Sequence, residues 1–336
     1  MKQETTVIGW HGISARVPAD WTLAGVGGDA RQGYLRVDYE GMPRLQVKWA
    51  RRHIDLEKKR AEYVKRLTVG ERRLLGRLRA GRPTGTEVTT DVRVVSKRAK
   101  PGKDIVSYGW RGAHCGVGLL WNCEVCGRAV MAQVGWPIAE EGRETGQEVL
   151  ESLDDHGIGG WEAWGVDGLA FLTPQEYELE GWRRMTRYLE LRLVRGERGR
   201  GVGQPRGESA GFTKPAPRGE KLKVARWGMV PLVLKERSVQ AWYEEANLRR
   251  RDVSWVSEEE QIKGHDGVAA TGQRRRLAGG MRTGLARALR RSPAVEFEAR
   301  AWHCPESNRL YLVEALYGGE GEALHGAVES IMCHEE

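Results

Sequence analysis

The spacing of apolar residues along the chain predicts short strands and a few helices. Leu45–Trp49 places an apolar side chain at every second position, which is the period of a half-buried strand. Ile13–Val17 and Leu169–Leu172 are apolar segments that each run into a proline, which ends a strand because it cannot donate to a sheet ladder. Apolar residues between Leu56 and Leu67 lie near helical spacing, and Asp55 can cap the start of that helix.

The second part of each half of the chain predicts a long hairpin followed by a short helix. In the first half these segments are Val117–Trp121, Ala129–Val134 and Gly146–Leu153. In the second half they are Val295–Trp302, Leu310–Leu316 and Leu324–Met332. Together the elements predict an α+β fold in which an antiparallel β-sheet is packed with helices, formed twice along the chain.

The two halves also share sequence, which indicates an internal duplication. The aligned segments, in order, are 12–23 with 168–179, 47–49 with 225–227, 121–128 with 302–309, and 151–153 with 329–331. Because the blocks keep the same order and differ only by small insertions, coincidence is a poor explanation. We therefore predict two tandem repeats of like topology, residues 1–156 and 157–336.

The second repeat contains an insertion at residues 195–220, where the first repeat has only a short turn. The insertion is rich in glycine, proline and charged side chains. Such a composition cannot bury apolar area, so we predict an exposed basic loop between two adjacent strands.

The start and end of the first repeat carry a family resemblance. Ile13, Pro18 and Trp21 belong to a Gly-Ile-x-x-x-x-Pro-x-x-Trp opening, and the repeat closes with Leu150-Glu151-Ser152-Leu153. This order of elements resembles the PsbP-like superfamily, which includes DcrB-type proteins. The resemblance implies an α+β domain in each repeat. It also implies a non-enzymatic role, because members of that superfamily are mostly binding or assembly modules without a common active site.

Two cysteines separated by two residues form the sharpest local motif. Cys123 and Cys126 are followed by Gly127, a spacing typical of a knuckle turn that supplies half of a tetrahedral zinc site. The second repeat keeps Cys304 at the matching turn, but Ser307 stands in place of the second cysteine. We predict that the two sulfurs of the first repeat face each other at a hairpin tip.

Zinc requires two further ligands, and the sequence leaves their source open. The predicted ligand set is Cys123, Cys126, His303 and Cys304. Cys333 and His334, close to the end of the sequence, are the alternative source. Without metal, the pair is either two reduced thiols that stabilise a turn or a redox pair. Redox pairs usually lie at a helix N-terminus, which a hairpin does not offer.

Composition narrows the classes of partner. The net charge of +8 suits an anionic partner, and Arg274, Arg275 and Arg276 are the candidate nucleic-acid contacts. No segment approaches 18 apolar residues and no apolar signal region is present, so we expect a cytoplasmic protein without a membrane span.

Functional motifs add little to this picture. No catalytic triad or phosphate-binding glycine loop is recognisable in the sequence. We therefore expect a non-enzymatic binding or assembly module that binds a protein partner or self-associates. The alternatives are a nucleic-acid-associated basic protein and a zinc-containing regulator or enzyme that uses the Cys123/Cys126 turn.

Overall fold

The protein is described by a computed structural model. The described residues are 4–78, 87–90, 94, 100–112, 114–196, 220–248, 250, 253–274, 295–318 and 321–334. The chain divides into two compact units, Met1–Ala170 and Phe171–Glu336. This division falls later than the repeat boundary predicted at residues 156 and 157. The reason is that the first strand of the second repeat, β10 (Trp161–Val166), pairs with β1 (Thr5–Trp10).

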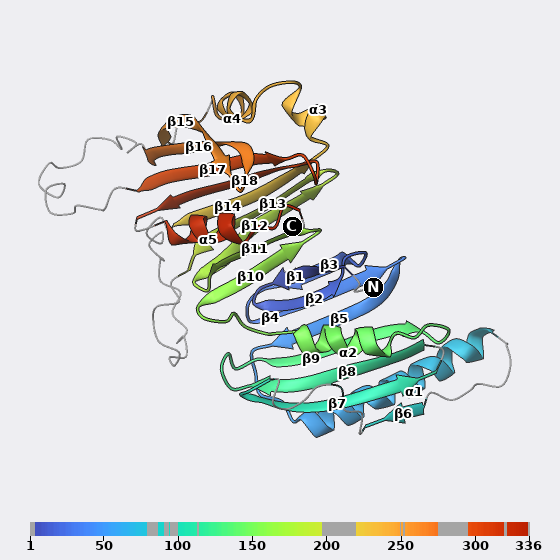
Figure 1. Cartoon of the computed structure of the whole chain (residues 1–336). Coiled ribbons are helices and arrows are strands. Elements are labelled where there is room, and N and C mark those ends of the chain that lie inside the picture. Colours follow the sequence, from blue (N-terminus) through green and yellow to red (C-terminus); the bar gives the residue numbers. More distant parts are fainter. Residues whose placement is uncertain are drawn as a thin grey trace, which may run out of the picture. The chain divides into compact units, whose positions relative to one another are not determined.

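The first unit contains a seven-stranded antiparallel sheet (Figure 1). Its strands, in spatial order, are β3 (Thr22–Gly28), β4 (Gln32–Tyr39), β5 (Met42–Ala50), β9 (Ala129–Pro137), β8 (His114–Cys123), β7 (Lys103–Arg111) and β6 (Glu87–Thr89). The hairpin of β8 and β9 carries the Cys-containing turn, and its register places Trp121 opposite Val130. In this turn Gly127 has a φ of +68°, which glycine adopts at no steric cost.

The second unit contains a second seven-stranded antiparallel sheet. Its strands, in spatial order, are β12 (Tyr177–Met185), β13 (Tyr188–Arg195), β14 (Lys221–Gly228), β18 (Arg309–Tyr317), β17 (Glu296–Cys304), β16 (His265–Arg274) and β15 (Val253–Ile262). Position by position, this is the strand order of the first sheet. The ends of the predicted basic loop meet between β13 and β14, where the Arg195 N–H donates to the Glu220 carbonyl at 2.9 Å. Residues 197–219 of that loop lie outside the described residues.

A smaller antiparallel sheet has the order β11 (Leu169–Pro174), β10, β1 and β2 (Ile13–Pro18). Gly9 of β1 lies opposite Gly165 of β10, and the two glycines occupy equivalent positions of the two repeats. A Cβ atom on Gly9 would lie 2.5 Å from the Ala163 carbonyl oxygen. Glycine is therefore required where these two strands meet.

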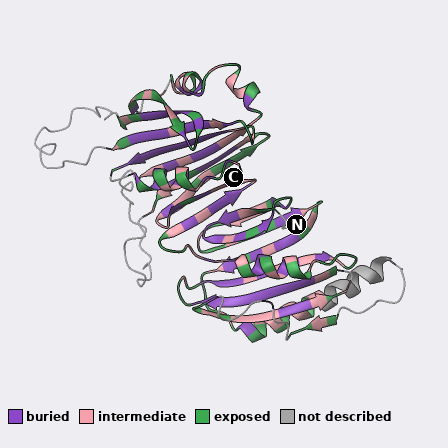
Figure 2. Cartoon of the chain, in the orientation of Figure 1, coloured by how far each residue is buried: buried purple, intermediate pink, exposed green. Residues whose placement is uncertain are grey.

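Helices cover both faces of each large sheet. In the first unit α1 (Leu56–Leu78) packs on β7 and β8, where Leu56 is buried with Tyr108 and Leu120. Helix α2 (Arg143–Ser152) packs on β8, β9 and β2. In the second unit α4 (Val239–Asn247) packs on β15, β16 and β17, and α5 (Glu322–Ser330) packs on β14, β17 and β18. A short helix, α3 (Val230–Leu234), precedes α4. Figure 2 shows the central strands of both large sheets as largely buried.

The predicted α+β class is wrong, because the described residues form a mostly β protein built on three antiparallel sheets. Some edge strands carry no pattern that predicts a strand: β3 contains three glycines, and β15 contains three consecutive glutamates. An edge strand with an exposed face does not need alternating apolar residues, and backbone pairing with its neighbour decides its conformation. Within the described part of the chain, no helix combines the length and the apolar character that crossing a membrane requires.

Candidate metal centre

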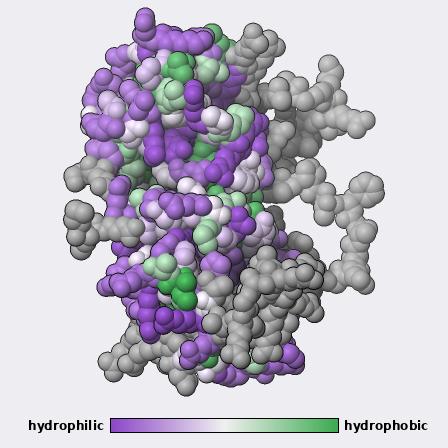
Figure 3. Space-filling model, turned by 90° about the vertical axis from the view of Figure 1, so that its right-hand side faces the viewer, coloured by the Kyte–Doolittle hydropathy of each residue, from purple (hydrophilic) through white to green (hydrophobic). Residues whose placement is uncertain are grey.

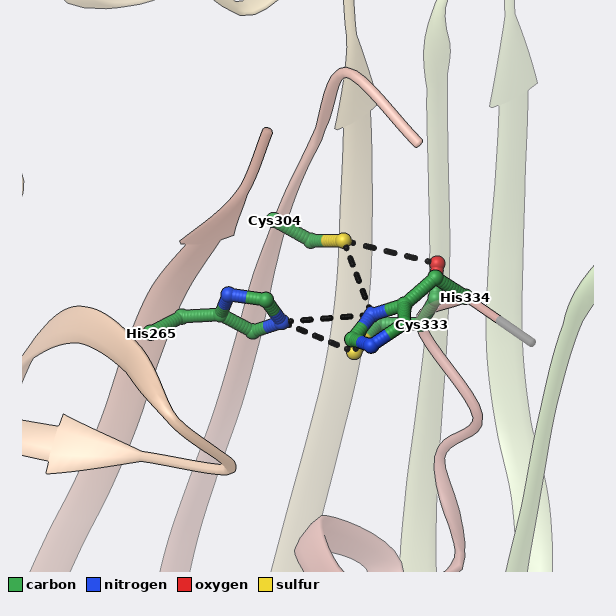
Figure 4. Close-up of side chains that lie close together, drawn as sticks. All are labelled: His265, Cys304, Cys333 and His334. Carbon is green, nitrogen blue, oxygen red and sulfur yellow. Dashed lines mark hydrogen bonds between the residues drawn. The ribbon is translucent and has the colours of Figure 1, made fainter. Parts of the chain in front are cut away.

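Four side chains of the second unit converge on one point (Figure 4). They are His265, Cys304, Cys333 and His334, and one ligand atom of each lies within 4.8 Å of all the others. The four residues come from three separate elements of the sequence: the β15–β16 turn, the end of β17, and the segment after α5. Tertiary structure therefore assembles the group.

The strands place the first two ligands opposite each other. Lys263 and Gly264 have φ values of +54° and +77°, so they form the two-residue turn that starts β16 at His265. Along the β16–β17 ladder Gly267 lies opposite Trp302. Two residues further along this antiparallel ladder, His265 faces Cys304 at the last position of β17.

The other two ligands follow the end of α5. The chain leaves the helix at Ile331, whose ψ of 114° is extended and whose side chain is buried. Ser330 fixes the exit, because its hydroxyl accepts the Leu172 N–H of β11 at 2.8 Å and donates to the Gly326 carbonyl. The extended segment then carries Cys333 and His334 to the end of β17, where the Cys304 sulfur lies 3.6 Å from the Cys333 carbonyl oxygen.

The distances within the group match the edges of a tetrahedron around a metal ion. His265 Nε2 lies 3.3 Å from His334 Nδ1 and 3.4 Å from Cys333 Sγ. His334 Nδ1 lies 3.4 Å from Cys304 Sγ and 3.3 Å from Cys333 Sγ. Tetrahedral zinc with ordinary bond lengths would give about 3.3 Å between two nitrogens and about 3.6 Å between nitrogen and sulfur. A hydrogen bond could explain each contact singly, but a shared ion explains why all four converge.

The surroundings of the group favour metal binding. The Glu306 carboxylate lies 3.9 Å from His265 Nδ1, on the side of the ring that faces away from the other ligands. A carboxylate in this place favours the tautomer with the proton on Nδ1 and leaves the Nε2 lone pair directed at the group. Glu306 also accepts a hydrogen bond from the Cys304 thiol at 3.3 Å.

Burial favours the protonated thiols at this point in the absence of a cation. His265, Cys304 and Cys333 are all buried, with Cys304 fully inaccessible. Burial, and then the neighbouring Cys304, raise the pKa of the Cys333 thiol. The indole N–H of Trp302 opposes that rise and has no oxygen or nitrogen partner among the described residues. A divalent cation would stabilise both sulfurs as thiolates and leave the buried site neutral.

A second group lies in the first unit and contains Cys123, Cys126 and Asp155, again with ligand atoms within 4.8 Å of one another. The Cys126 thiol donates to Asp155 Oδ2 at 3.3 Å. Burial and the Asp155 charge raise the pKa of Cys126 to about 12, so this sulfur remains a thiol at neutral pH. The carboxylate also forms an ion pair with Lys103 at 2.9 Å. Because Cys126 keeps its proton and Asp155 is paired with Lys103, this group has fewer side chains free to bind a metal than the group of the second unit.

The four residues of the predicted ligand set are divided between these places. Cys123 and Cys126 belong to the group of the first unit, and Cys304 belongs to the group of the second. His303 belongs to neither, although it precedes Cys304. Cys333 and His334, the alternative source of ligands, join Cys304. His265 was not identified as a ligand; its position directly after a Lys-Gly hairpin turn was the available signal.

The other candidate residues carry less information. Arg274 ends β16, while Arg275 and Arg276 lie outside the described residues. No protein-family model matches the chain, and a search of curated proteins found no match.

Proposed function

We propose that this chain is a non-enzymatic binding or assembly protein whose second unit holds a structural zinc ion. The observation that carries the proposal is the spacing of His265 Nε2, Cys304 Sγ, Cys333 Sγ and His334 Nδ1. Two sulfur and two nitrogen ligands in tetrahedral order are typical of zinc. The non-enzymatic part of the proposal rests on the sequence, in which no catalytic triad or phosphate-binding glycine loop is recognisable.

The number of protein ligands supports a structural role for the ion. Catalytic zinc sites retain an open position for water or substrate, whereas structural sites have four protein ligands. Here all four positions are filled by side chains, and three of those side chains are buried. The ion would join the start of β16 and the end of β17 to the segment after α5.

Purified chain should contain one zinc ion per molecule by elemental analysis. The physical reason is that a buried four-ligand site binds zinc tightly, with about 10–16 kcal/mol of apparent binding free energy in zinc-finger peptides. His303→Ala is the matched control, since His303 neighbours Cys304 but lies outside the group, and it should keep the ion. Zinc-free protein that takes up no added zinc would refute the proposal.

A second candidate function is binding of single-stranded nucleic acid on the first unit. A groove of about 1080 Å³ is lined by basic side chains: Arg31, Lys48, Arg51, Arg52 and Lys59. Among the described residues, Lys48, Arg51 and Arg52 form no ion pair. Tyr34 also lines the groove and is 48% exposed, so it offers a ring on which a base can stack.

The groove carries little negative charge to oppose a phosphate backbone. Its one carboxylate, Asp29, accepts the backbone N–H groups of Arg31 and Gln32 at 2.7 and 3.0 Å, and these hydrogen bonds lower its pKa. The face seen in Figure 3 is mostly hydrophilic, with only small separate hydrophobic patches among the coloured residues.

Lys48→Glu with Arg51→Glu should weaken binding of a single-stranded oligonucleotide by about tenfold or more and reduce its salt dependence, because phosphate contacts release counterions. Fluorescence anisotropy over a range of salt concentrations measures both. Arg16→Glu with Lys235→Glu makes the same change of net charge at exposed positions outside the groove and should have a much smaller effect. Equal losses in the two double variants would show that only net charge matters.

A further inference from the structure

The metal group of the second unit has a counterpart at the same place in the first unit. In the β7–β8 ladder Lys103 lies opposite Cys123, and Ile105 lies opposite Trp121. In the β16–β17 ladder Gly267 lies opposite Trp302, the residue that aligns with Trp121. Lys103 is therefore the structural equivalent of His265, two residues before the position opposite the tryptophan.

The closing segments correspond in the same way. In the first unit the Ser152 hydroxyl accepts the Arg16 N–H of β2 at 2.9 Å. In the second unit the Ser330 hydroxyl accepts the Leu172 N–H of β11 at 2.8 Å. Counting onward from the two serines, Asp155 is equivalent to Cys333 and His156 is equivalent to His334. Cys123 is equivalent to Cys304, so the four ligands correspond to Lys103, Cys123, Asp155 and His156.

The Lys103 side chain reaches Asp155, the equivalent of Cys333. Its ammonium contacts Asp155 Oδ1 and Asp154 Oδ1, both at 2.9 Å, and lies 5.4 Å from the centre of the Trp121 ring. The Lys103 side chain is 3% exposed and that of Asp155 is fully buried. Trp121 Nε1 donates to Asp155 Oδ2 at 3.1 Å, as the equivalent Trp302 acts on Cys333. The ammonium thus contacts the equivalent of Cys333 and lies over the ring of the equivalent of Trp302, two of the neighbours of the proposed ion.

Charge is balanced in both units by different means. Two thiolates would neutralise a divalent zinc ion in the second unit, after each thiol has released its proton to solvent. In the first unit one ammonium faces the Asp155 carboxylate, and buried charges of opposite sign satisfy each other. The first unit has Lys103 and Asp155 at the positions of His265 and Cys333, so it forms an ion pair where the second unit would bind a metal ion. Neither arrangement leaves a buried charge without a partner.

We infer that the ammonium of Lys103 occupies in the first unit the position that a divalent metal ion takes in the second, which leaves a latent Cys2His2 site in the first unit. This inference rests on the zinc site of the proposed function. It predicts one ion per chain, although both units carry cysteines at the corresponding turn. It also predicts that two substitutions are enough to complete a second site for zinc.

The competing explanation is that the group of Cys123, Cys126 and Asp155 binds metal without any substitution. Three groups already contact its carboxylate: Lys103, the Trp121 indole and the Cys126 thiol. A metal would have to displace a buried ammonium and take a proton from Cys126. The ion pair and the metal therefore exclude each other at this position.

The test measures the zinc content of a double variant, Lys103→His with Asp155→Cys. The variant is purified, or refolded, in the presence of zinc. Together with Cys123 and His156, these changes supply the ligand set of the second unit. Zinc should rise from one to two ions per chain, and Co²⁺ substitution should double the thiolate-to-cobalt absorption. The matched control is Lys103→His with Asp155→Ser, and both chains also carry Cys126→Ser because the Cys126 sulfur lies in the same group. The control then keeps Cys123 as the one cysteine of that group and should remain at one ion.

A second measurement covers the case in which the double variant does not fold. Cys123→Ser with Cys126→Ser, in the otherwise unchanged chain, should keep one zinc ion. Loss of an ion from this variant would overturn the inference, as would a folded Lys103→His, Asp155→Cys chain with no additional ion. Zinc-free wild-type protein would instead refute the proposed function. A rise from zero to one ion in the double variant would even then support the latent site.

Discussion

Cys333→Ser should release the zinc ion and lower the melting temperature of the second unit by roughly 10 °C. A ligand present at about a thousand times its dissociation constant stabilises the folded state by about 4 kcal/mol, and each kcal/mol shifts the midpoint of a unit of this size by about 2–4 °C. The seven-stranded sheet remains, so we expect a folded but less stable unit. Calorimetry with parallel zinc analysis measures both changes.

Cys115→Ser is the matched control for this substitution. Cys115 lies in β8 of the first unit and belongs to neither metal group, so its replacement should leave the zinc content unchanged. A chelator should lower the melting temperature of the Cys115→Ser protein and have no effect on the Cys333→Ser protein. A Cys333→Ser protein that keeps both its zinc and its melting temperature would contradict the assignment of this ligand.

Lys103→Met should cost the first unit about 3–5 kcal/mol, because it leaves the Asp155 carboxylate buried without its cation. Methionine keeps most of the volume and the apolar stem of lysine, so the loss reports the missing charge. Adding Asp155→Asn removes the unpaired charge and should restore part of the stability. Denaturant unfolding measures the stability of Lys103→Met and of Lys103→Met with Asp155→Asn. Equal stability of these two variants would show that the unpaired Asp155 charge is not the cause of the loss.

The pH dependence of stability tests the direction in which Lys103 shifts the pKa of Asp155. Burial alone would raise the pKa of Asp155, but the charge and hydrogen bonds of Lys103 outweigh it, so the pKa is lowered. The stability from Asp155 is therefore present above its unfolded pKa, about 3.9, and is lost as pH falls through the folded value. In Lys103→Met only the hydrogen bonds from Trp121 and Cys126 still oppose burial, so the pKa of Asp155 should be higher than in the wild type. The stability gained as pH rises through the Asp155 transition should therefore be smaller in this variant, as measured by denaturant unfolding at several pH values.

The internal repeat could be read from the sequence, because duplicated segments keep their local patterns of apolar residues. The hairpin segments 117–134 and 295–316 lie in β8, β9, β17 and β18, and the predicted closing helices lie in α2 and α5. The Cys turn was also visible, since a Cys-x-x-Cys-Gly motif acts within one turn. Local interactions between residues close in sequence determine all of these features.

The extent of the sheets could not be read in this way. Strands β3 and β15 lie at sheet edges and carry glycine or glutamate where an alternating pattern would need apolar residues. Their conformation depends on backbone hydrogen bonds to β4 and β16. Because those bonds involve no particular side chain, the sequence favoured an α+β fold over the observed, mostly β one.

The sequence by itself determined which side chains are able to bind a metal, and only the tertiary structure decided which of them meet. Cys304 was predicted with His303, its neighbour in sequence, but adjacent residues of a strand point to opposite faces of the sheet. Strand register instead brings His265 to Cys304, and the extended segment after α5 adds Cys333 and His334. In the first unit the same register brings Lys103 to Cys123, where an ion pair forms with Asp155. Ladder position thus brings together residues that are far apart in the chain, and the side chains at those positions decide whether the group consists of possible metal ligands or of an ion pair.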